Sequence, residues 1–478
     1  MFGDKQLGSL VEELAAILDR DPSAILTEGL ERFSEPARGK PGDLDLVLVP
    51  GSIAQVQQMI RWARSHGLRL IPQGANSGLV EASTPGPGDV AIVMSTDRLA
   101  GEIEINPTDR TAVVSAGVRL SALNEKLSLH GLRLPIDLGA DPTIGGMAAT
   151  NTGGARMLRH GDMRRHVLGL EAVLADDEVS VVDELSTLRK NNTGLALTHL
   201  LVGSGGSLGV ITRVAVEVEP IAGSTACAWL IPRDPQSAIA ALNHLEKRWG
   251  SSLSAFEVAS LSAIDAALKH IANLQDPFAH VATVGPESCE LRVLIEFESE
   301  ATAWESSAEA RLVEALAELD EARLIVDAVV TSPEHGWHLR HSISEGLRLS
   351  GTIVGFDVSI PRSLLPTFLD RAKSAVRSTF PRATVADFGH WGDGGVHCSV
   401  IVPFEEPLSD EEYAQLRQLV FSIAVEEFGG CFSAEHGVGP ANADWWKRSK
   451  SEGSQRLTHA IKAACDPLGV LGHPRMPY

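Results

Sequence analysis

Between Leu44 and Pro220, the order of apolar and polar residues predicts a β-rich region with glycine-dense turns. Residues Ile53 to Gly67 have helical apolar spacing and finish on glycine, the residue that commonly follows a helix C-terminus. Strands are expected on both sides of this helix, at LDLVLVP and LRLIPQG, so the region starts as strand, helix, strand. Further strands are expected at VAIVMST, TAVVSAGV, LEAVLAD and LGVITRVAVEVEP.

After Pro220 the pattern changes to strands that alternate with long helices, which predicts an antiparallel or mixed sheet with helices on one face. The strands are expected at CAWLIP, LRVLIEFES, LIVDAVV, TIVGFDVSIP and VHCSVIVP. The helices are expected at PQSAIAALNHLEKRW, TAWESSAEARLVEALAEL and LLPTFLDRAKSAVRSTF, with another at RLTHAIKAACDP. We therefore expect a first domain at residues 1–220 with an amphipathic N-terminal helix, a second at 221–443, and a final segment at 444–478.

The composition of the 478-residue chain is that of a globular protein of two or three domains. A net charge of −21 argues against nucleic acid or an anionic membrane as the main partner. The sequence has neither a signal-peptide pattern at its start nor an apolar run long enough for a transmembrane segment. Five scattered cysteines without a CxxC pair indicate reduced thiols. A cytoplasmic protein is expected, and peripheral attachment to a membrane through another subunit stays open.

Three glycine-rich segments suggest a cofactor site: PQGANSG, PTIGGMAATNTGG and GSGGSLGVIT. Glycines allow successive backbone N–H groups to converge on an anion. Small hydrogen-bonding side chains in the first two segments suit a pyrophosphate or the edge of a flavin. In the third segment the glycine spacing does not fit GxGxxG and the following residues are strand-like, so a Rossmann phosphate site is not expected. For each segment taken alone, a tight turn is the alternative.

Two motifs near the end of the chain, GHWGDGGVH and SAEHGVG, offer His390, His397, Glu435 and His436. Two histidines and one glutamate are a known zinc donor set that leaves a position for water or a substrate oxygen. Glu435 and His436 would diverge from an extended backbone, so one of them could bind metal while the other faces the substrate. A metal so placed lowers the pKa of a bound hydroxyl, which suits a chelating 2-hydroxy acid. The alternative is that each histidine is an ordinary core or surface residue.

Three further residues have simpler interpretations. Asp393 lies between glycines and is expected to cap the turn. Cys398 directly follows His397 on a predicted strand, so it should point to the opposite face. Arg340 could bind a carboxylate, although on sequence alone a surface ion pair is favoured.

These segments, together with ARMLRHGD, occur in the order and at the spacing of one family, and the whole chain resembles the FAD-linked 2-hydroxy-acid dehydrogenases. That group includes D-2-hydroxyglutarate dehydrogenase, D-lactate dehydrogenase and the flavin subunit of glycolate oxidase. The resemblance implies an α+β fold of vanillyl-alcohol-oxidase type. Residues 1–220 would form a two-subdomain FAD-binding domain and 221–443 a substrate-cap domain with an antiparallel sheet and the metal site. Residues 444–478 would return to the FAD domain.

The resemblance also implies roles for individual residues. His390, His397 and Glu435 would bind Zn²⁺ or another divalent metal, with His436 as the base. The substrate would contact Arg340, Ser344 and Ser399. FAD would be held without a covalent bond, since Asn76 or a neighbour occupies the position often taken by histidine in covalent relatives. The expected FAD contacts are Gly74, Ala75, Asn76, Ser77, Gly78, Thr143, Gly145, Gly146, Thr150, Asn151, Val210 and Ile211.

Two departures from the family pattern bear on the substrate. A pocket lysine of the D-2-hydroxyglutarate dehydrogenases corresponds to Gly355, and an asparagine corresponds to Ser399. Binding both ends of a dicarboxylate would normally use such donors. A monocarboxylate with an uncharged or bulky tail is therefore favoured over 2-hydroxyglutarate.

The predicted reaction is oxidation of a D-2-hydroxy acid to the 2-keto acid, with His436 taking the hydroxyl proton and the flavin N5 taking a hydride. A quinone, a cytochrome or an electron-transfer flavoprotein would reoxidise the flavin, and O₂ is a further option. Two alternatives stay open: a metal-independent FAD alcohol oxidoreductase of the same fold, and a flavin-binding electron-transfer subunit. A homodimer is also left open.

Overall fold

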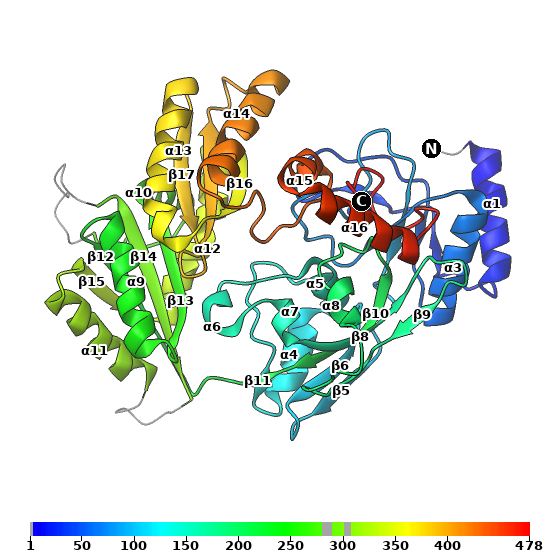
Figure 1. Cartoon of the computed structure of the whole chain (residues 1–478), viewed down its shortest axis with the longest axis horizontal. Helices are drawn as coiled ribbons and strands as arrows, with labels where there is room; N and C mark the ends of the chain where they lie inside the picture. The colour runs from blue at the N-terminus through cyan, green and yellow to red at the C-terminus, as the bar shows by residue number, and fades with distance from the viewer. Residues whose placement is uncertain (1–2, 280–288, 301–306) are drawn as a thin grey trace. The chain divides into compact units, whose positions relative to one another are not determined.

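The computed structural model describes residues 3–279, 289–300 and 307–478 (Figure 1). It divides into two compact units. The first contains Met1–Gly154, Gly161–Pro220 and Glu435–Tyr478, and the second contains Ala155–His160 and Ile221–Ala434. Met1 and Phe2 of the expected N-terminal helix, and residues 302–306 of the helix expected at TAWESSAEARLVEALAEL, lie outside the described residues.

The first unit begins with a four-stranded sheet of order β1-β2-β4-β3, in which β4 pairs in parallel with both β2 and β3. Its core joins apolar residues of these strands to α1 and α3. Ser52 caps α3 by accepting the Gln55 N–H, and Gly67 ends it at φ 62°, as the glycine in the pattern predicts. The elements are α1 (Asp4–Ile17), β1 (Ile25–Leu26), α2 (Glu31–Ser34), β2 (Val47–Leu48), α3 (Ile53–His66), β3 (Leu70–Gln73) and β4 (Ile92–Ser95).

A second sheet of the same unit is five-stranded and antiparallel, in the order β5-β6-β10-β8-β9. Its strands are β5 (Ile103–Asn106), β6 (Thr111–Ser115), β8 (Val167–Val173), β9 (Val181–Asp183) and β10 (Val210–Glu217), and a separate pair is formed by β7 (Leu132–Arg133) and β11 (Glu219–Pro220). The helices of this part are α4 (Leu120–Ser128), α5 (Ile144–Thr150), α7 (Met163–His166) and α8 (Leu197–Leu201).

The C-terminal segment of the first unit carries α15 (Ala443–Ser449) and α16 (Glu452–Cys465). The buried ammonium of Lys462 in α16 donates to Asp466 and to the backbone oxygens of Ser207 and Leu471, at 2.6 to 2.9 Å. Ser207 belongs to the third glycine-rich segment. The hydrogen bonds of the buried Lys462 ammonium therefore hold the C-terminal segment against the third glycine-rich segment.

The second unit is built on a seven-stranded antiparallel sheet of order β15-β12-β14-β13-β17-β18-β16. The strands are β12 (Ser224–Pro232), β13 (Leu253–Ser260), β14 (Leu291–Ser299), β15 (Ile325–Thr331), β16 (Thr352–Ser359), β17 (Thr384–Gly389) and β18 (Gly395–Val402). The helices are α6 (Met157–His160), α9 (Pro235–Trp249), α10 (Leu261–His270), α11 (Ala308–Glu321), α12 (Pro333–Ser350), α13 (Leu365–Thr379) and α14 (Asp410–Ser422).

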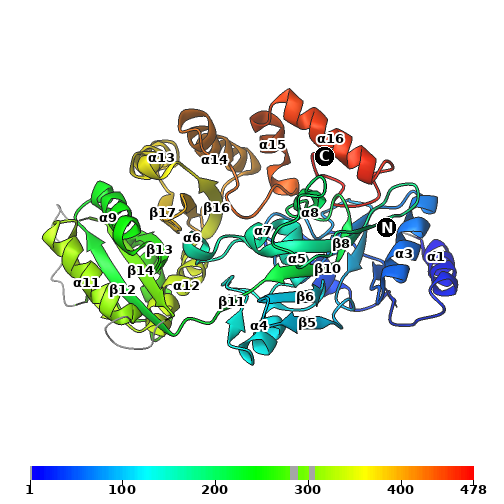
Figure 2. The ribbon, with the colours of Figure 1, turned by 60° about the horizontal axis from the view of Figure 1, so that its bottom comes forward.

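Helices cover both faces of this sheet, so the expectation of helices on one face is wrong. Alternate β12 residues, Cys227, Trp229 and Ile231, share a core with α10 and α12. On the opposite face Trp249 of α9 lies against Phe297, with ring centroids 6.3 Å apart, and α9 and α11 pack side by side (Figure 2). Every residue of β13 and β14 is buried, as is typical of strands that are covered on both faces.

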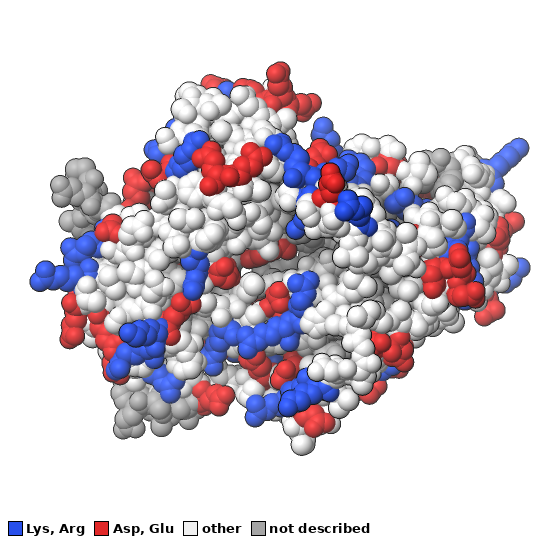
Figure 3. Space-filling view, viewed as in Figure 1, with Lys and Arg blue, Asp and Glu red and all other residues white. Residues whose placement is uncertain are grey.

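The surface of each unit carries charges of both signs. On the face drawn in Figure 3, acidic and basic side chains are interspersed. Exposed ion pairs include Arg371–Glu427 and Arg248–Glu314. Among the described residues, no helix combines the length and the apolar character that crossing a membrane needs.

Candidate flavin site and metal centre

The three glycine-rich segments meet one another in the first unit. A Cβ atom on Gly74 would lie 2.3 Å from Thr143 Oγ1, and one on Gly206, which has φ 73°, would lie 3.2 Å from Pro72 Cβ, so glycine is favoured at both positions. The second and third segments are joined by backbone hydrogen bonds from Gly203 N to Ala148 O and from Gly205 N to Ala149 O. The loops expected to hold FAD therefore lie against one another.

The side chains of several expected FAD contacts make hydrogen bonds within the protein. Thr143 caps α5 by accepting the Gly146 N–H. Asn76 donates to Glu35 O at 2.8 Å and accepts from Ser83 Oγ at 2.9 Å, while Asn151 donates to Asp162 Oδ2 at 2.7 Å. Because these side chains are already hydrogen-bonded, they hold the loops in shape.

The remaining expected contacts have varied exposure. Val210 and Ile211 are buried at the start of β10, whereas Ser77 and Gly78 are exposed. The third segment also contains a buried hydroxyl, Ser204 Oγ, that has no hydrogen-bond partner among the described residues. An unsatisfied buried hydroxyl in one of these glycine-rich loops fits a polar ligand such as FAD.

His390 and His397 are brought together by the β17–β18 hairpin of the second unit. Asp393 Oδ1 accepts the Gly395 N–H at 2.8 Å, so Asp393 caps the turn as expected. The two imidazole rings lie edge to face with centroids 5.4 Å apart. Cys398 points away from them, and its burial raises the thiol pKa to about 12.

The SAEHGVG segment leaves the second unit along β16. Cys431 N donates to Ser359 O at 2.9 Å and Ala434 N donates to Asp357 O at 3.1 Å. Glu435 and His436 follow Ala434 directly. One ligand atom from each of His390, His397 and Glu435 lies within 4.8 Å of the others. The set predicted from the sequence as metal ligands therefore has the proximity that a metal ion needs.

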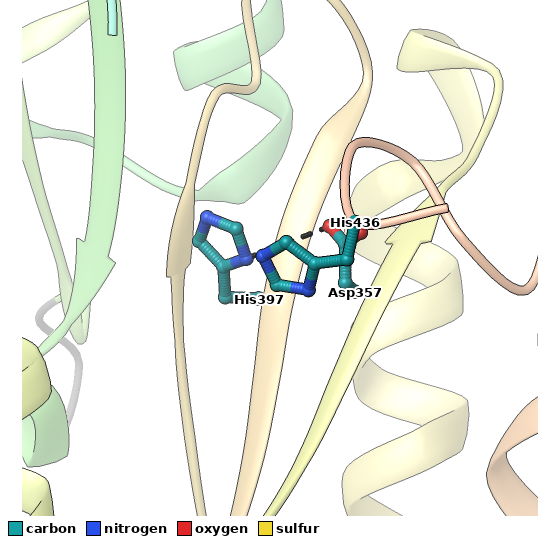
Figure 4. A group of neighbouring side chains, drawn as sticks. All are labelled: Asp357, His397 and His436. Atoms are coloured by element: carbon teal, nitrogen blue, oxygen red, sulfur yellow. Dashed lines mark ion pairs between the residues drawn. The ribbon is translucent and has the colours of Figure 1, made fainter. Parts of the chain in front are cut away.

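A second donor set overlaps the first and includes a residue that the sequence did not indicate. Asp357, His397 and His436 also bring ligand atoms within 4.8 Å of one another (Figure 4). Asp357 is opposite His397 in the β16–β18 register, and its Oδ1 lies 3.6 Å from His397 Nδ1. The only signal for Asp357 in the sequence is a carboxylate inside an apolar strand. His397 belongs to both sets.

Arg340 makes a buried ion pair, in place of the surface pair that the sequence favoured. Its Nε donates to Glu257 Oε2 at 2.7 Å, its Nη2 forms an ion pair with the same oxygen at 2.6 Å, and its guanidinium lies over the Phe388 ring. Glu257 Oε1 also accepts from His390 Nδ1 at 2.5 Å. Burial alone would raise the pKa of Glu257, but the charges and hydrogen bonds of His390 and Arg340 lower it to about 2. Glu257, which the sequence analysis did not identify, is therefore an anionic link between two expected site residues.

The other two expected substrate contacts are arranged differently. Ser344 is exposed on α12, one helical turn after Arg340. Ser399 is buried on β18, two residues after His397 and so on the same sheet face. Ser399 is opposite Gly355 of β16, which places the two departures from the family pattern side by side.

Comparison with known proteins identifies the class. Residues 44–183 match the FAD binding domain, and residues 225–473 match the C-terminal domain of FAD linked oxidases. The solved 4-ethylphenol oxidase from Gulosibacter chungangensis shares the fold, with a TM-score of 0.72 and 17% identity over 98% of this chain and 96% of that one. The fold is thus of vanillyl-alcohol-oxidase type, as expected, and the protein is an FAD-dependent oxidoreductase.

The sequence relatives are more specific. A probable mitochondrial D-2-hydroxyglutarate dehydrogenase of Oryza sativa subsp. indica is 34% identical over 437 residues, covering 90% of this chain and 74% of the relative. A D-2-hydroxyglutarate dehydrogenase of Stutzerimonas stutzeri is 29% identical over 479 residues, covering 98% and 97%. The chain belongs to the FAD-linked oxidase family, and the resemblance noted in its sequence is confirmed.

Proposed function

We propose that this protein is an FAD- and Zn²⁺-dependent dehydrogenase that oxidises a D-2-hydroxy acid to the 2-keto acid. The observation that carries the proposal is the proximity of His390, His397 and Glu435, whose ligand atoms lie within 4.8 Å of one another. Two histidines and one carboxylate match the catalytic zinc sites that keep a position open for substrate. The names of the relatives, D-2-hydroxyglutarate dehydrogenases, support a 2-hydroxy acid.

The chain's own residues would bind the substrate and move one proton. Zn²⁺, when bound, would supply a Lewis acid for the substrate hydroxyl, and FAD, when bound, would supply the two-electron acceptor. His436 would take the hydroxyl proton on an imidazole nitrogen. The glycine-lined backbone would hold FAD without a covalent bond, and a separate quinone, cytochrome or electron-transfer flavoprotein would reoxidise it.

The substrate is proposed to be a monocarboxylate with an uncharged tail. Gly355 and Ser399 lie opposite each other, on the same two strands as the Asp357 and His397 pair. Gly355 has no side chain and Ser399 offers only a neutral hydroxyl, so this pair cannot neutralise a second carboxylate. A panel of D-2-hydroxy acids should give a higher kcat/KM for apolar tails than for D-2-hydroxyglutarate.

Chelation tests the proposal as a whole. The purified yellow protein should contain about one zinc per chain, lose dye-coupled turnover of D-2-hydroxy acids after treatment with a chelator, and recover it with Zn²⁺. The FAD content is measured in parallel, so that loss of flavin is not mistaken for loss of metal. Full activity without metal would exclude the metal-dependent mechanism and leave a metal-independent alcohol oxidoreductase.

A pair of adjacent variants separates metal ligand from base. Glu435→Ala should lose zinc and activity together, whereas His436→Ala should keep zinc and lose turnover by about 10²–10⁴-fold, the usual contribution of a general base. Zinc is measured by elemental analysis, and turnover by dye reduction. Zinc retained in Glu435→Ala and lost in His436→Ala would instead assign the metal to Asp357, His397 and His436.

A further inference from the structure

Glu257 is a fully buried carboxylate that meets two functional side chains from different elements. It lies on β13, at 1% exposure, on the sheet face covered by α12. Its Oε1 accepts from His390 Nδ1 at the end of β17, and its Oε2 accepts from Arg340 Nε of α12 and forms an ion pair with Arg340 Nη2. The register that pairs Val258 with Gly389 brings Glu257 beside His390.

The contact with His390 fixes which ring nitrogen is available for a metal. A carboxylate accepts a hydrogen bond only from a protonated ring nitrogen, so Nδ1 carries the proton. Nε2 is then the nitrogen that can coordinate. Carboxylates that hold a metal-binding histidine in this way fix its tautomer and ring orientation and raise its basicity.

The contact with Arg340 holds a positive charge on the same carboxylate that contacts His390. The guanidinium is held on one side by Glu257 Oε2 and lies over the Phe388 ring, 4.8 Å from its centroid. Phe388 in turn lies beside His397, with ring centroids 5.1 Å apart. A planar guanidinium held in this way keeps one orientation toward an anionic substrate.

We propose that Glu257 is a positioning residue that aims His390 at the metal and Arg340 at the substrate carboxylate. The inference rests on the proposed function, because it takes His390 as a metal ligand. It adds to that function a residue that joins the metal site to the anion site. A purely structural Glu257 would stabilise the sheet and leave metal affinity unchanged.

The test compares Glu257→Gln with Glu296→Gln in the FAD-loaded full chain. Glu296 is a matched control: it is equally buried on the adjacent strand and pairs with Arg156 and Trp337. Zinc affinity is measured by competition with a chromophoric chelator, and ligand geometry by the visible spectrum of the Co²⁺-substituted proteins. Glu257→Gln should bind zinc about 10- to 100-fold more weakly with an altered Co²⁺ spectrum, as expected for loss of such a carboxylate. Glu296→Gln should keep the zinc affinity and the Co²⁺ spectrum of the wild type.

The outcomes separate the two proposals. A wild-type protein that binds no zinc would remove the proposed function. A Glu257→Gln variant with wild-type zinc affinity and Co²⁺ spectrum would overturn the role of Glu257 alone, as would an equal loss in both variants. Glu257→Asp is the second variant if Glu257→Gln does not fold. It keeps the charge but is one methylene shorter, and it should also weaken zinc binding.

Discussion

Replacing His397 by alanine is expected to abolish metal binding at the proposed centre and to lower kcat/KM by at least ~1000-fold. The reason is geometric: His397 belongs to both donor sets, so its loss leaves two donors whichever set holds the metal. A metal acting as a Lewis acid contributes several kcal/mol to transition-state stabilisation, and about 4 kcal/mol corresponds to ~1000-fold in rate. Elemental analysis and steady-state kinetics measure the two effects.

The matched control for this prediction is His338→Ala. His338 is an exposed histidine of α12 in the same unit and is absent from both donor sets. It should keep the zinc content and kcat/KM of the wild type. If His397→Ala retained metal and turned over substrate at the wild-type rate, the proposed metal centre would be wrong.

Elements with strong local signals could be predicted closely from the sequence. The structure places α9 at Pro235–Trp249, the residues that the pattern indicates, because Asp234 caps it and proline occupies its first turn. By contrast α12 was not predicted as a helix. Its apolar face is interrupted by Gly336 and Gly346, and Gly346 is required because a Cβ there would lie 2.6 Å from Ala267 Cα of α10. This requirement comes from packing against another helix, so it leaves no pattern in the local sequence.

The candidate site also contains residues that the sequence could indicate and residues that it could not. His390, His397, Glu435 and His436 stand in two glycine-rich motifs, so residue type and spacing make them candidate metal donors, and the family resemblance selects His390, His397 and Glu435 among them. Glu257 and Asp357 are single acids in apolar strands. Their partners are set by sheet register, which pairs β13 with β17 and β16 with β18. Register depends on how strands far apart in the sequence align, so local sequence reasoning could not find these contacts.

Replacing Glu296 by alanine is expected to cost about 3–5 kcal/mol of unfolding free energy, because it removes a buried carboxylate that is the nearest ion-pair partner of the mostly buried Arg156 side chain. Glu296 is 0% exposed and accepts from Arg156 Nε and Nη2 at 2.6 and 2.8 Å. It also accepts from Trp337 Nε1 at 2.6 Å and Ser254 Oγ at 2.7 Å. Alanine would remove the acceptor that these three side chains share in the interior of the second unit.

Arg156 belongs to the short segment Ala155–His160, which joins the second unit while its flanking residues belong to the first. Hydrogen exchange should therefore rise first in this segment of Glu296→Ala, because its main buried anchor has gone. Urea denaturation followed by far-UV circular dichroism measures the free energy. Glu314→Ala is the control, since Glu314 pairs with Arg248 at the surface with both side chains more than half exposed, and its loss should cost under about 1 kcal/mol. Equal costs in the two variants would show that the buried pair is no more important for stability than the exposed one.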